Sequence, residues 1–157
     1  MISYAQGAIL GLIQGVTELQ CGSYVFMDVN YRRIGGKDGR PIYTDFAPSL
    51  SVLTTVVNTN RPDRVSLDAG IKAFSTDTEE TPEAKDRSGL NYRRAGDEFG
   101  SLTAEPGVPL PQLGDRLEFY VPHCDPTVNL YDRLYVFRGD RVEAVWPIAA
   151  RREFRPG

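Results

Sequence analysis

The chain has 157 residues, of which 41% are hydrophobic and 25% are charged, and its formal net charge is −3. That length is enough for one domain with a buried core, and the composition is ordinary for a soluble globular protein. Acidic and basic residues are interspersed without a long basic run, so we do not expect nucleic acid as a partner. Cys21 and Cys124 fit neither a disulfide framework nor a zinc-ribbon spacing, which favours a cytoplasmic location.

Residues 1–18 form an apolar segment with one charged residue, Glu18. Its length and periodicity predict a helix, in which Gly7, Gly11 and Gly15 form a small-residue ridge suited to close packing. The segment lacks the basic start and cleavage pattern of a signal peptide, and it is marginal in length for a membrane span. We expect a helix docked on the domain. A membrane-anchored protein that uses residues 2–17 as its span is the alternative.

The same segment also resembles the opening of undecaprenyl-diphosphate phosphatases, which carry a Gln-Gly-x-Thr-Glu run that corresponds here to residues 14–18. The resemblance ends at Leu19, and the further apolar helices of such a membrane enzyme do not follow. We therefore do not transfer that function to this chain.

Beyond residue 19 the pattern changes to short, β-rich runs separated by turn signals. A glycine-rich loop is predicted over 34–45 and an irregular, proline-rich connection over 105–113. The sequence predicts a mostly-β barrel or sandwich over 19–150, preceded by the hydrophobic helix and followed by a loose tail at 151–157. The predicted strands are 24–30, 50–58, 64–68, 71–74, 98–104, 115–121, and a hairpin of 133–138 with 141–148.

The chemically richest stretch contains the only histidine, His123, followed by Cys124 and Asp125. In an extended segment, residues two apart project to the same side, so His123 and Asp125 would converge while Cys124 points away. Pro122 and Pro126 flank the three residues and are expected to prevent helix formation. Imidazole and carboxylate together suggest half of a site for zinc, manganese or a similar metal. A structural or solvated histidine is the alternative reading.

Other polar clusters have simpler interpretations. The acidic stretch 77–80 is interpreted as a solvated surface, and Arg133, Arg138 and Arg141 as the solvated face of the hairpin. Trp146 is expected in the core or in an interface.

Three segments, Gly15–Asp28, Leu67–Ala73 and Val121–Tyr131, occur in an order that resembles the C-terminal part of D-threonine aldolases and their relatives, the eukaryotic-type D-serine dehydratases. The resemblance covers about residues 15–150. It implies a two-domain enzyme of the alanine-racemase-like class, in which an N-terminal α/β barrel binds pyridoxal phosphate through a lysine. A C-terminal β domain closes over the site and supplies metal ligands.

By this resemblance, His123 and Asp125 are the metal ligands and His123 is the catalytic residue, with manganese or zinc, or alternatively magnesium, as the metal. The metal would activate a water or the hydroxyl of a small D-β-hydroxy amino acid, and D-threonine would be cleaved to glycine and acetaldehyde. Ser23 and Tyr24 correspond to the region near the cofactor phosphate. Asp125 follows the aldolase-like variant, where the dehydratase-like variant has cysteine.

The family's barrel would precede residue 15, and none of the three lysines, Lys37, Lys72 and Lys85, matches the cofactor lysine. Without an electron sink the metal ligands do not stabilise a carbanion, so the chain alone is expected to be inactive. It would then act with a barrel, or as a homodimer. A D-serine dehydratase-like lyase domain and a non-catalytic domain that binds a metal or a partner are the alternatives.

Overall fold

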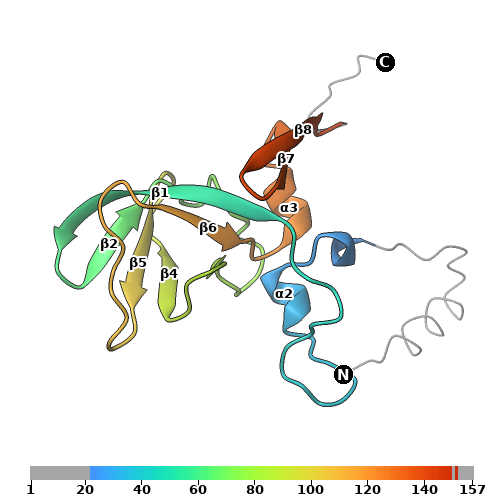
Figure 1. Cartoon of the computed structure of the whole chain (residues 1–157), viewed down its shortest axis with the longest axis horizontal. Coiled ribbons are helices and arrows are strands. Elements are labelled where there is room, and N and C mark those ends of the chain that lie inside the picture. Colours follow the sequence, from blue (N-terminus) through green and yellow to red (C-terminus); the bar gives the residue numbers. More distant parts are fainter. Residues whose placement is uncertain (1–21, 150, 152–157) are drawn as a thin grey trace, which may run out of the picture.

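The computed structural model describes residues 22–149 and residue 151, and it is mostly β, as predicted (Figure 1). Short helices lie at one end of a six-stranded sheet, and a separate two-stranded hairpin follows them. The elements are η1 (Ser23–Val25, a 3-10 helix), α2 (Val29–Arg32), β1 (Ser51–Arg61), β2 (Arg64–Leu67), β3 (Glu83–Ala84), β4 (Leu90–Arg94), β5 (Gly100–Ala104), β6 (Arg116–Tyr120), α3 (Cys124–Val128), β7 (Arg133–Arg138) and β8 (Arg141–Pro147).

The larger sheet has the strand order β3-β6-β1-β2-β5-β4, and every neighbouring pair is antiparallel. The long strand β1 pairs with β6 through residues 51–55 and with β2 through residues 56–61. Two register shifts interrupt its pairing with β2, and such irregularities increase the local twist. The edge strands β3 and β4 contact each other, so the sheet curls into a nearly closed barrel.

The core lies inside this curled sheet, where alternate residues of the strands point inward. Phe74, Tyr92 and Phe119 meet edge to face at its centre, with ring centroids 5.4–6.3 Å apart. The Tyr92 hydroxyl donates to the carbonyl of Ala69, which satisfies its polar end inside the core. Burial raises the pKa of Tyr92 to about 12.

The strand predicted over 24–30 is wrong, because this segment forms η1 and α2. Met27 adopts a left-handed conformation with φ 54°, which interrupts an extended chain. Asp28 then caps α2 by accepting a hydrogen bond from the backbone N–H of Tyr31 at 2.7 Å. The buried Met27 and Val29 produced a strand-like pattern although they flank a helix cap.

The strand predicted over 71–74 is also wrong. Ala73 and Phe74 both donate their N–H to the carbonyl of Gly70, which makes a turn. A Cβ at Gly70 would lie 2.3 Å from the carbonyl oxygen of Gly96, so only glycine allows this close backbone approach. The strands β3 and β4 are additional elements that the sequence did not predict.

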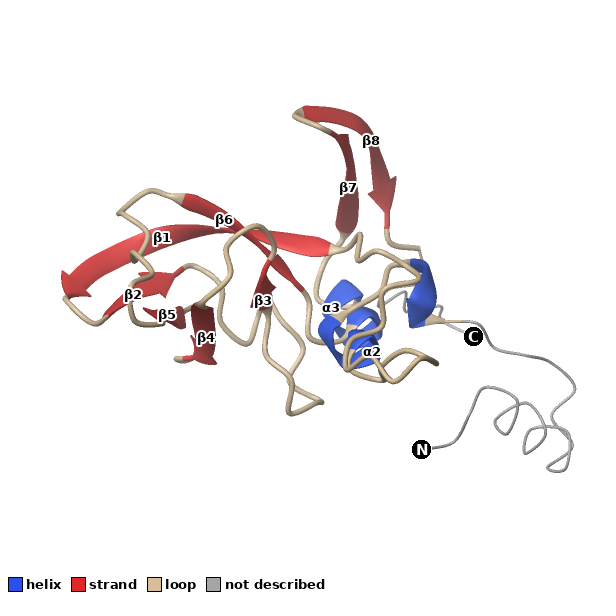
Figure 2. Ribbon diagram, turned by 60° about the horizontal axis from the view of Figure 1, so that its bottom comes forward, coloured by secondary structure: helices blue, strands red, loops and turns tan. Residues whose placement is uncertain are grey.

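The hairpin β7–β8 was predicted at this position and projects away from the larger sheet (Figure 2). It exposes large side chains, and Trp146 is 52% exposed, so of the two predicted places for Trp146 the core is wrong and the interface stays a prediction. Arg133, Arg138 and Arg141 are exposed, as predicted. Two strands alone bury too little apolar surface to shield both of their faces. The exposed large hydrophobic residues of the hairpin are Tyr135, Phe137, Val142, Val145 and Trp146.

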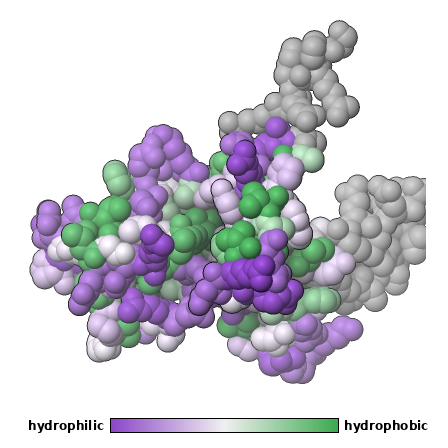
Figure 3. All heavy atoms as spheres, turned by 45° about the horizontal axis from the view of Figure 1, so that its top comes forward, coloured by the Kyte–Doolittle hydropathy of each residue, from purple (hydrophilic) through white to green (hydrophobic). Residues whose placement is uncertain are grey.

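Hydrophilic side chains dominate the face shown in Figure 3, and hydrophobic groups reach the surface in several separate places. No helix in the described part of the chain is long and apolar enough to cross a membrane. The helix predicted over residues 1–18 lies outside the described residues, as does most of the predicted tail. At the start of that tail, Arg151 donates hydrogen bonds to the carbonyls of Asn129 and Leu130.

Candidate metal centre

The predicted metal-binding segment begins where β6 ends, but it is not extended as expected. His123 has an extended backbone and is the N-cap of α3, which then runs through Cys124–Val128. The expectation that the flanking prolines prevent a helix is wrong, because Pro126 occupies the first turn. The N–H groups of that turn have no partner within the helix, so proline is tolerated there.

The helix start nevertheless brings the two predicted ligands together. The distance between Nε2 of His123 and Oδ2 of Asp125 is 3.7 Å. This separation is too long for a hydrogen bond. It is close to the roughly 3.4–3.7 Å expected between two ligands that each lie about 2.1 Å from one cation. His123 is 22% exposed and Asp125 is 72% exposed in their side chains, so the pair opens toward solvent.

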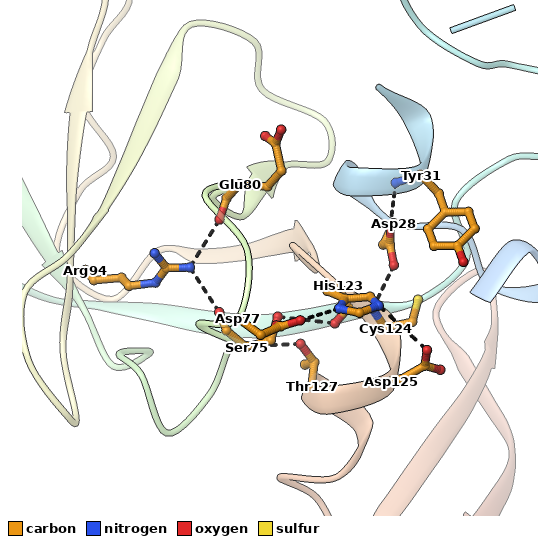
Figure 4. A network of polar contacts seen from close by, with 10 residues as sticks. All are labelled: Asp28, Tyr31, Ser75, Asp77, Glu80, Arg94, His123, Cys124, Asp125 and Thr127. Atoms are coloured by element: carbon orange, nitrogen blue, oxygen red, sulfur yellow. Dashed lines mark hydrogen bonds and ion pairs between the residues drawn. The ribbon is translucent and has the colours of Figure 1, made fainter. Parts of the chain in front are cut away.

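A third residue, Asp77, contacts the other nitrogen of the same imidazole. Its Oδ2 lies 2.5 Å from Nδ1 of His123 (Figure 4). Partial burial raises the pKa of Asp77, but the hydrogen bonds from His123, from the backbone of Asp77 and from Ser75, together with the charge interaction with His123, outweigh this effect and hold the pKa below its usual value. A hydrogen bond from Nδ1–H to a carboxylate leaves Nε2 as the free lone pair, which is the arrangement of metal-binding histidines.

Asp77 is exposed, in agreement with the interpretation of 77–80 as a solvated surface, but that interpretation missed its contact with His123. Asp77 is 46 positions from His123, and no local spacing links the two residues. Only the packing of the 75–80 loop against α3 brings them together (Figure 4). Its position in an acidic, polar stretch gave no signal that one carboxylate turns toward a histidine.

Hydrogen bonds with three residues fix the loop that carries Asp77. Nη2 of Arg94, from β4, donates to the carbonyls of Ser75 and Glu80, each at 3.1 Å. The backbone N–H of Ser75 donates to Oγ1 of Thr127 at 3.1 Å, and its hydroxyl donates to the carbonyl of His123 at 3.3 Å. Both ends of the loop are thus held by hydrogen bonds, and one end is bonded directly to the predicted metal-binding segment.

Asp28 supports the opposite side of this segment. It is fully buried, and its Oδ2 accepts a hydrogen bond from the N–H of Cys124 at 2.8 Å while Oδ1 caps α2. Burial raises the pKa of the Cys124 thiol, whose sulfur lies 3.5 Å from the carbonyl oxygen of Met27. Cys124 is buried and turned away from the exposed Asp125, as predicted.

The donor set fits a divalent cation of the predicted kind. One neutral imidazole nitrogen and one carboxylate oxygen suit zinc, manganese or magnesium to different degrees. Within the described residues no group of three or more histidine, cysteine, aspartate or glutamate ligands occurs. The two side chains would therefore hold a cation whose other positions are open to water, a substrate or groups from elsewhere.

The predicted cofactor residues lie in η1. The Tyr24 ring packs against Phe46, with centroids 5.3 Å apart, rather than against a residue of the His123 cluster. Ser23 begins the same 3-10 turn. A role of Ser23 and Tyr24 at a cofactor phosphate stays a prediction.

The fold and the site define a mostly-β domain that presents a histidine and an aspartate at a helix start. Residues 49–137 match the family described as "Putative serine dehydratase domain". This chain belongs to that family, as the sequence motifs predicted.

Comparison with curated proteins shows similarity to two aldolases. The chain is 46% identical over 135 residues to a D-threonine aldolase of Arthrobacter sp, covering 86% of this chain and 34% of the relative. It is 38% identical over 135 residues to a 3-hydroxy-D-aspartate aldolase of Paracoccus denitrificans, covering 85% of this chain and 34% of the relative. The chain thus spans about a third of the length of these relatives.

Solved structures show the same relationship. The D-threonine aldolase from Filomicrobium marinum superposes with a TM-score of 0.75 at 36% identity, covering 88% of this chain and 38% of that one. The D-threo-3-hydroxyaspartate dehydratase from Delftia sp. HT23 shares the fold, with a TM-score of 0.64 at 24% identity, covering 85% of this chain and 39% of that one.

Proposed function

We propose that this chain is the metal-bearing β domain of a lyase that cleaves small D-β-hydroxy amino acids, with D-threonine as the substrate. One observation carries the proposal: Nε2 of His123 and Oδ2 of Asp125 lie 3.7 Å apart, while Nδ1 of the same imidazole is held by Asp77. The 46% identity to a D-threonine aldolase supports the choice of substrate.

In this proposal His123 and Asp125 hold a manganese or zinc ion, or alternatively magnesium. The bound ion supplies a Lewis acid that makes a water or the substrate β-hydroxyl easier to deprotonate, and pyridoxal phosphate in the full-length enzyme supplies an electron sink. Asp77 orients the imidazole and keeps its Nδ1 protonated, so that Nε2 faces the ion. Asp28 and Ser75 fix the peptide group between His123 and Cys124, because Asp28 accepts from its N–H and Ser75 donates to its carbonyl.

The ion pairs of Lys72 and Lys85 support a model in which this domain binds the metal and a separate barrel binds pyridoxal phosphate. Lys72 forms an ion pair with Glu98, and Lys85 forms one with Glu118 at 2.8 Å. The hydrogen bonds to these glutamates raise the pKa of both lysines. A lysine that forms a Schiff base needs the opposite, a lowered pKa, so neither is suited to hold pyridoxal phosphate. We propose that cleavage requires a barrel, in a longer chain or in a partner.

The hairpin β7–β8 gives a specific reason to consider a second role, in partner binding. It stands apart from the larger sheet and exposes Phe137, Val145 and Trp146. Exposed apolar groups gathered on one element mark contact surfaces in soluble proteins. We propose that this hairpin docks on the barrel or on a second copy of the chain. A D-serine dehydratase-like lyase is the alternative activity, and the aspartate rather than cysteine at residue 125 argues against it.

The experiment is a calorimetric titration of the purified chain with MnCl₂ and with ZnCl₂, repeated with His123→Ala and Asp125→Asn. Asp140→Asn is the matched control, because Asp140 is exposed in the hairpin turn and lies outside the site. We expect one saturable site in the parent and the control, and loss of at least tenfold in affinity in both site variants. Equal affinity in all four proteins would refute the metal assignment.

The same samples test the cofactor part of the proposal. An absorbance band near that of a pyridoxal Schiff base, or cleavage of D-threonine by the chain alone, would contradict the model in which a separate barrel binds pyridoxal phosphate. Metal binding without either signal supports it.

A further inference from the structure

A groove bordered by four arginines lies on the outer face of the larger sheet. One of them, Arg94, directs its guanidinium to the carbonyls of Ser75 and Glu80, so three arginines are available to a ligand. The groove has a volume of about 330 Å³, and its lining includes Arg61, Arg64, Arg93 and Arg94. The strands that form it, β1, β2, β5 and β4, lie side by side at the left of Figure 1. Because the whole chain has a net charge of −3, this local excess of positive charge is not a consequence of overall composition.

The strand register explains how the groove is built. Asn58 lies opposite Ser66, Ser66 lies opposite Ser101, and Ser101 lies opposite Arg93. Residues directly opposite each other in antiparallel strands point to the same face, so these four polar side chains form one row across four strands. Their neighbours Val65, Leu102 and Tyr92 are buried on the other face.

The arginines at the end of this row lack the partners that would offset their charge. Arg61 lies directly opposite Arg64, an arrangement that destabilises an antiparallel pair. Within the part of the chain that the structure describes, the one ion-pair partner of Arg64 is its sequence neighbour Asp63, at 3.9 Å. Among the described residues, neither Arg61 nor Arg93 forms an ion pair with a carboxylate. An anion in the groove would relieve this repulsion.

We propose that the groove binds a phosphate monoester of a small molecule. Guanidinium groups from two sides and hydroxyl donors on the floor match the several oxygens of a tetrahedral dianion. The volume accommodates the phosphate together with part of the organic group that carries it. The proposed ligand would contact Arg61, Arg64 and Arg93, none of which belongs to the candidate metal site, and the proposal does not depend on the proposed lyase activity.

The test is an NMR titration of the ¹⁵N-labelled chain with inorganic phosphate at constant ionic strength, balanced with NaCl. We expect saturable shifts of the amides of Ser66 and Ser101, and about a tenfold weaker affinity in Arg61→Gln and in Arg93→Gln. Arg141→Gln is the matched control, because Arg141 is exposed on the separate hairpin. Arg94 is left unchanged because it ties the 75–80 loop.

The outcomes separate the possible ligands. Unaltered affinity in both variants, or equal weakening in Arg141→Gln, would overturn the assignment. Tighter binding of succinate than of phosphate would show a carboxylate site, and binding of heparin alone would show a polyanion surface; either result overturns the proposal. Amide spectra of the variants in the absence of phosphate verify that they are folded. A loss of binding is then due to the missing guanidinium group and not to unfolding.

Discussion

Asp77 and His123 form a hydrogen-bonded pair across the edge of the candidate site, with Oδ2 of Asp77 2.5 Å from Nδ1 of the imidazole. Asp125 faces the opposite nitrogen of the same ring at 3.7 Å. One imidazole thus lies between two carboxylates that differ in distance and in role. In the proposed metal site, the closer carboxylate would fix the ring and the more distant one would share a cation with Nε2.

Asp77→Asn should weaken metal binding by about tenfold, and Asp77→Ala by up to about a hundredfold. The asparagine amide still offers an oxygen to Nδ1–H, but without the charge that stabilises this tautomer. The measurement is a calorimetric titration with ZnCl₂ at pH 7. Glu79→Gln, in the same loop, is the control and should bind metal as tightly as the parent. Unchanged affinity in Asp77→Ala would mean that His123 does not depend on Asp77.

Asp28→Ala should lower the free energy of unfolding by about 3 kcal/mol, because a buried carboxylate that accepts two backbone hydrogen bonds is removed. The N–H groups of Tyr31 and Cys124 would both lose their partner. Urea denaturation followed by circular dichroism measures the change. Asp63→Ala, at an exposed turn, should change stability by less than about 0.5 kcal/mol. A similar loss in both variants would show that Asp28 has no special structural role.

The strands were predictable where hydrophobic alternation coincided with turn signals. The runs at 50–58 and 115–121 became β1 and β6, and the hairpin across Gly139 formed where glycine and aspartate predicted it. In each case the local pattern and the tertiary environment favour the same conformation.

The strand prediction for residues 24–30 is wrong because the conformation of this segment depends on partners that are distant in the sequence. Val29 and Asn30 donate to the carbonyls of Val121 and Pro122, nearly a hundred residues away, and Asp28 bonds to Cys124. At the site, His123 and Asp125 were identifiable from adjacent residues and a family motif. Asp77 was not identifiable, because its contact with His123 joins two segments that lie 46 positions apart in the sequence.

Phe119→Ala should destabilise the domain by about 3–5 kcal/mol. Phe119 is 0% exposed and packs edge to face against Phe74 and Tyr92, so its removal leaves a cavity at the centre of the core. Thermal and urea unfolding measure the loss. Phe99→Ala removes the same side chain at a position that is 51% exposed, and it should cost less than about 1 kcal/mol. An equal loss of stability in Phe119→Ala and Phe99→Ala would mean that Phe119 is not at the centre of the core.

Phe137→Ser should reduce binding of a hydrophobic dye to the chain and lower any self-association seen by sedimentation. The prediction follows from the exposure of Phe137 on a hairpin that, among the described residues, forms a sheet separate from the larger one. Leu113→Ser is the control, since Leu113 is also exposed but lies outside the hairpin. If Leu113→Ser reduces dye binding as much as Phe137→Ser, the hairpin is not the dominant apolar surface.

The ion pair between Glu118 and Lys85 should make part of the stability depend on pH. The hydrogen bond from Lys85 lowers the pKa of Glu118 below its usual value of 4.5, and Ser51 adds a second hydrogen bond. A carboxyl group whose pKa is lower in the folded state stabilises the protein above the unfolded pKa. This contribution is lost as the pH falls through the folded pKa. Solvent screening limits it to about 1 kcal/mol or less, because both side chains are partly exposed.

Glu118→Gln should therefore be less stable than the parent at pH 7, and the difference should vanish near pH 2, where Glu118 is protonated in both states. Urea denaturation at a series of pH values between 2 and 7 measures this difference. Glu105→Gln, at an exposed position without an ion pair in the described structure, should give no pH-dependent difference from the parent. If the loss of unfolding free energy in Glu118→Gln is the same at every pH between 2 and 7, the effect comes from packing rather than from charge.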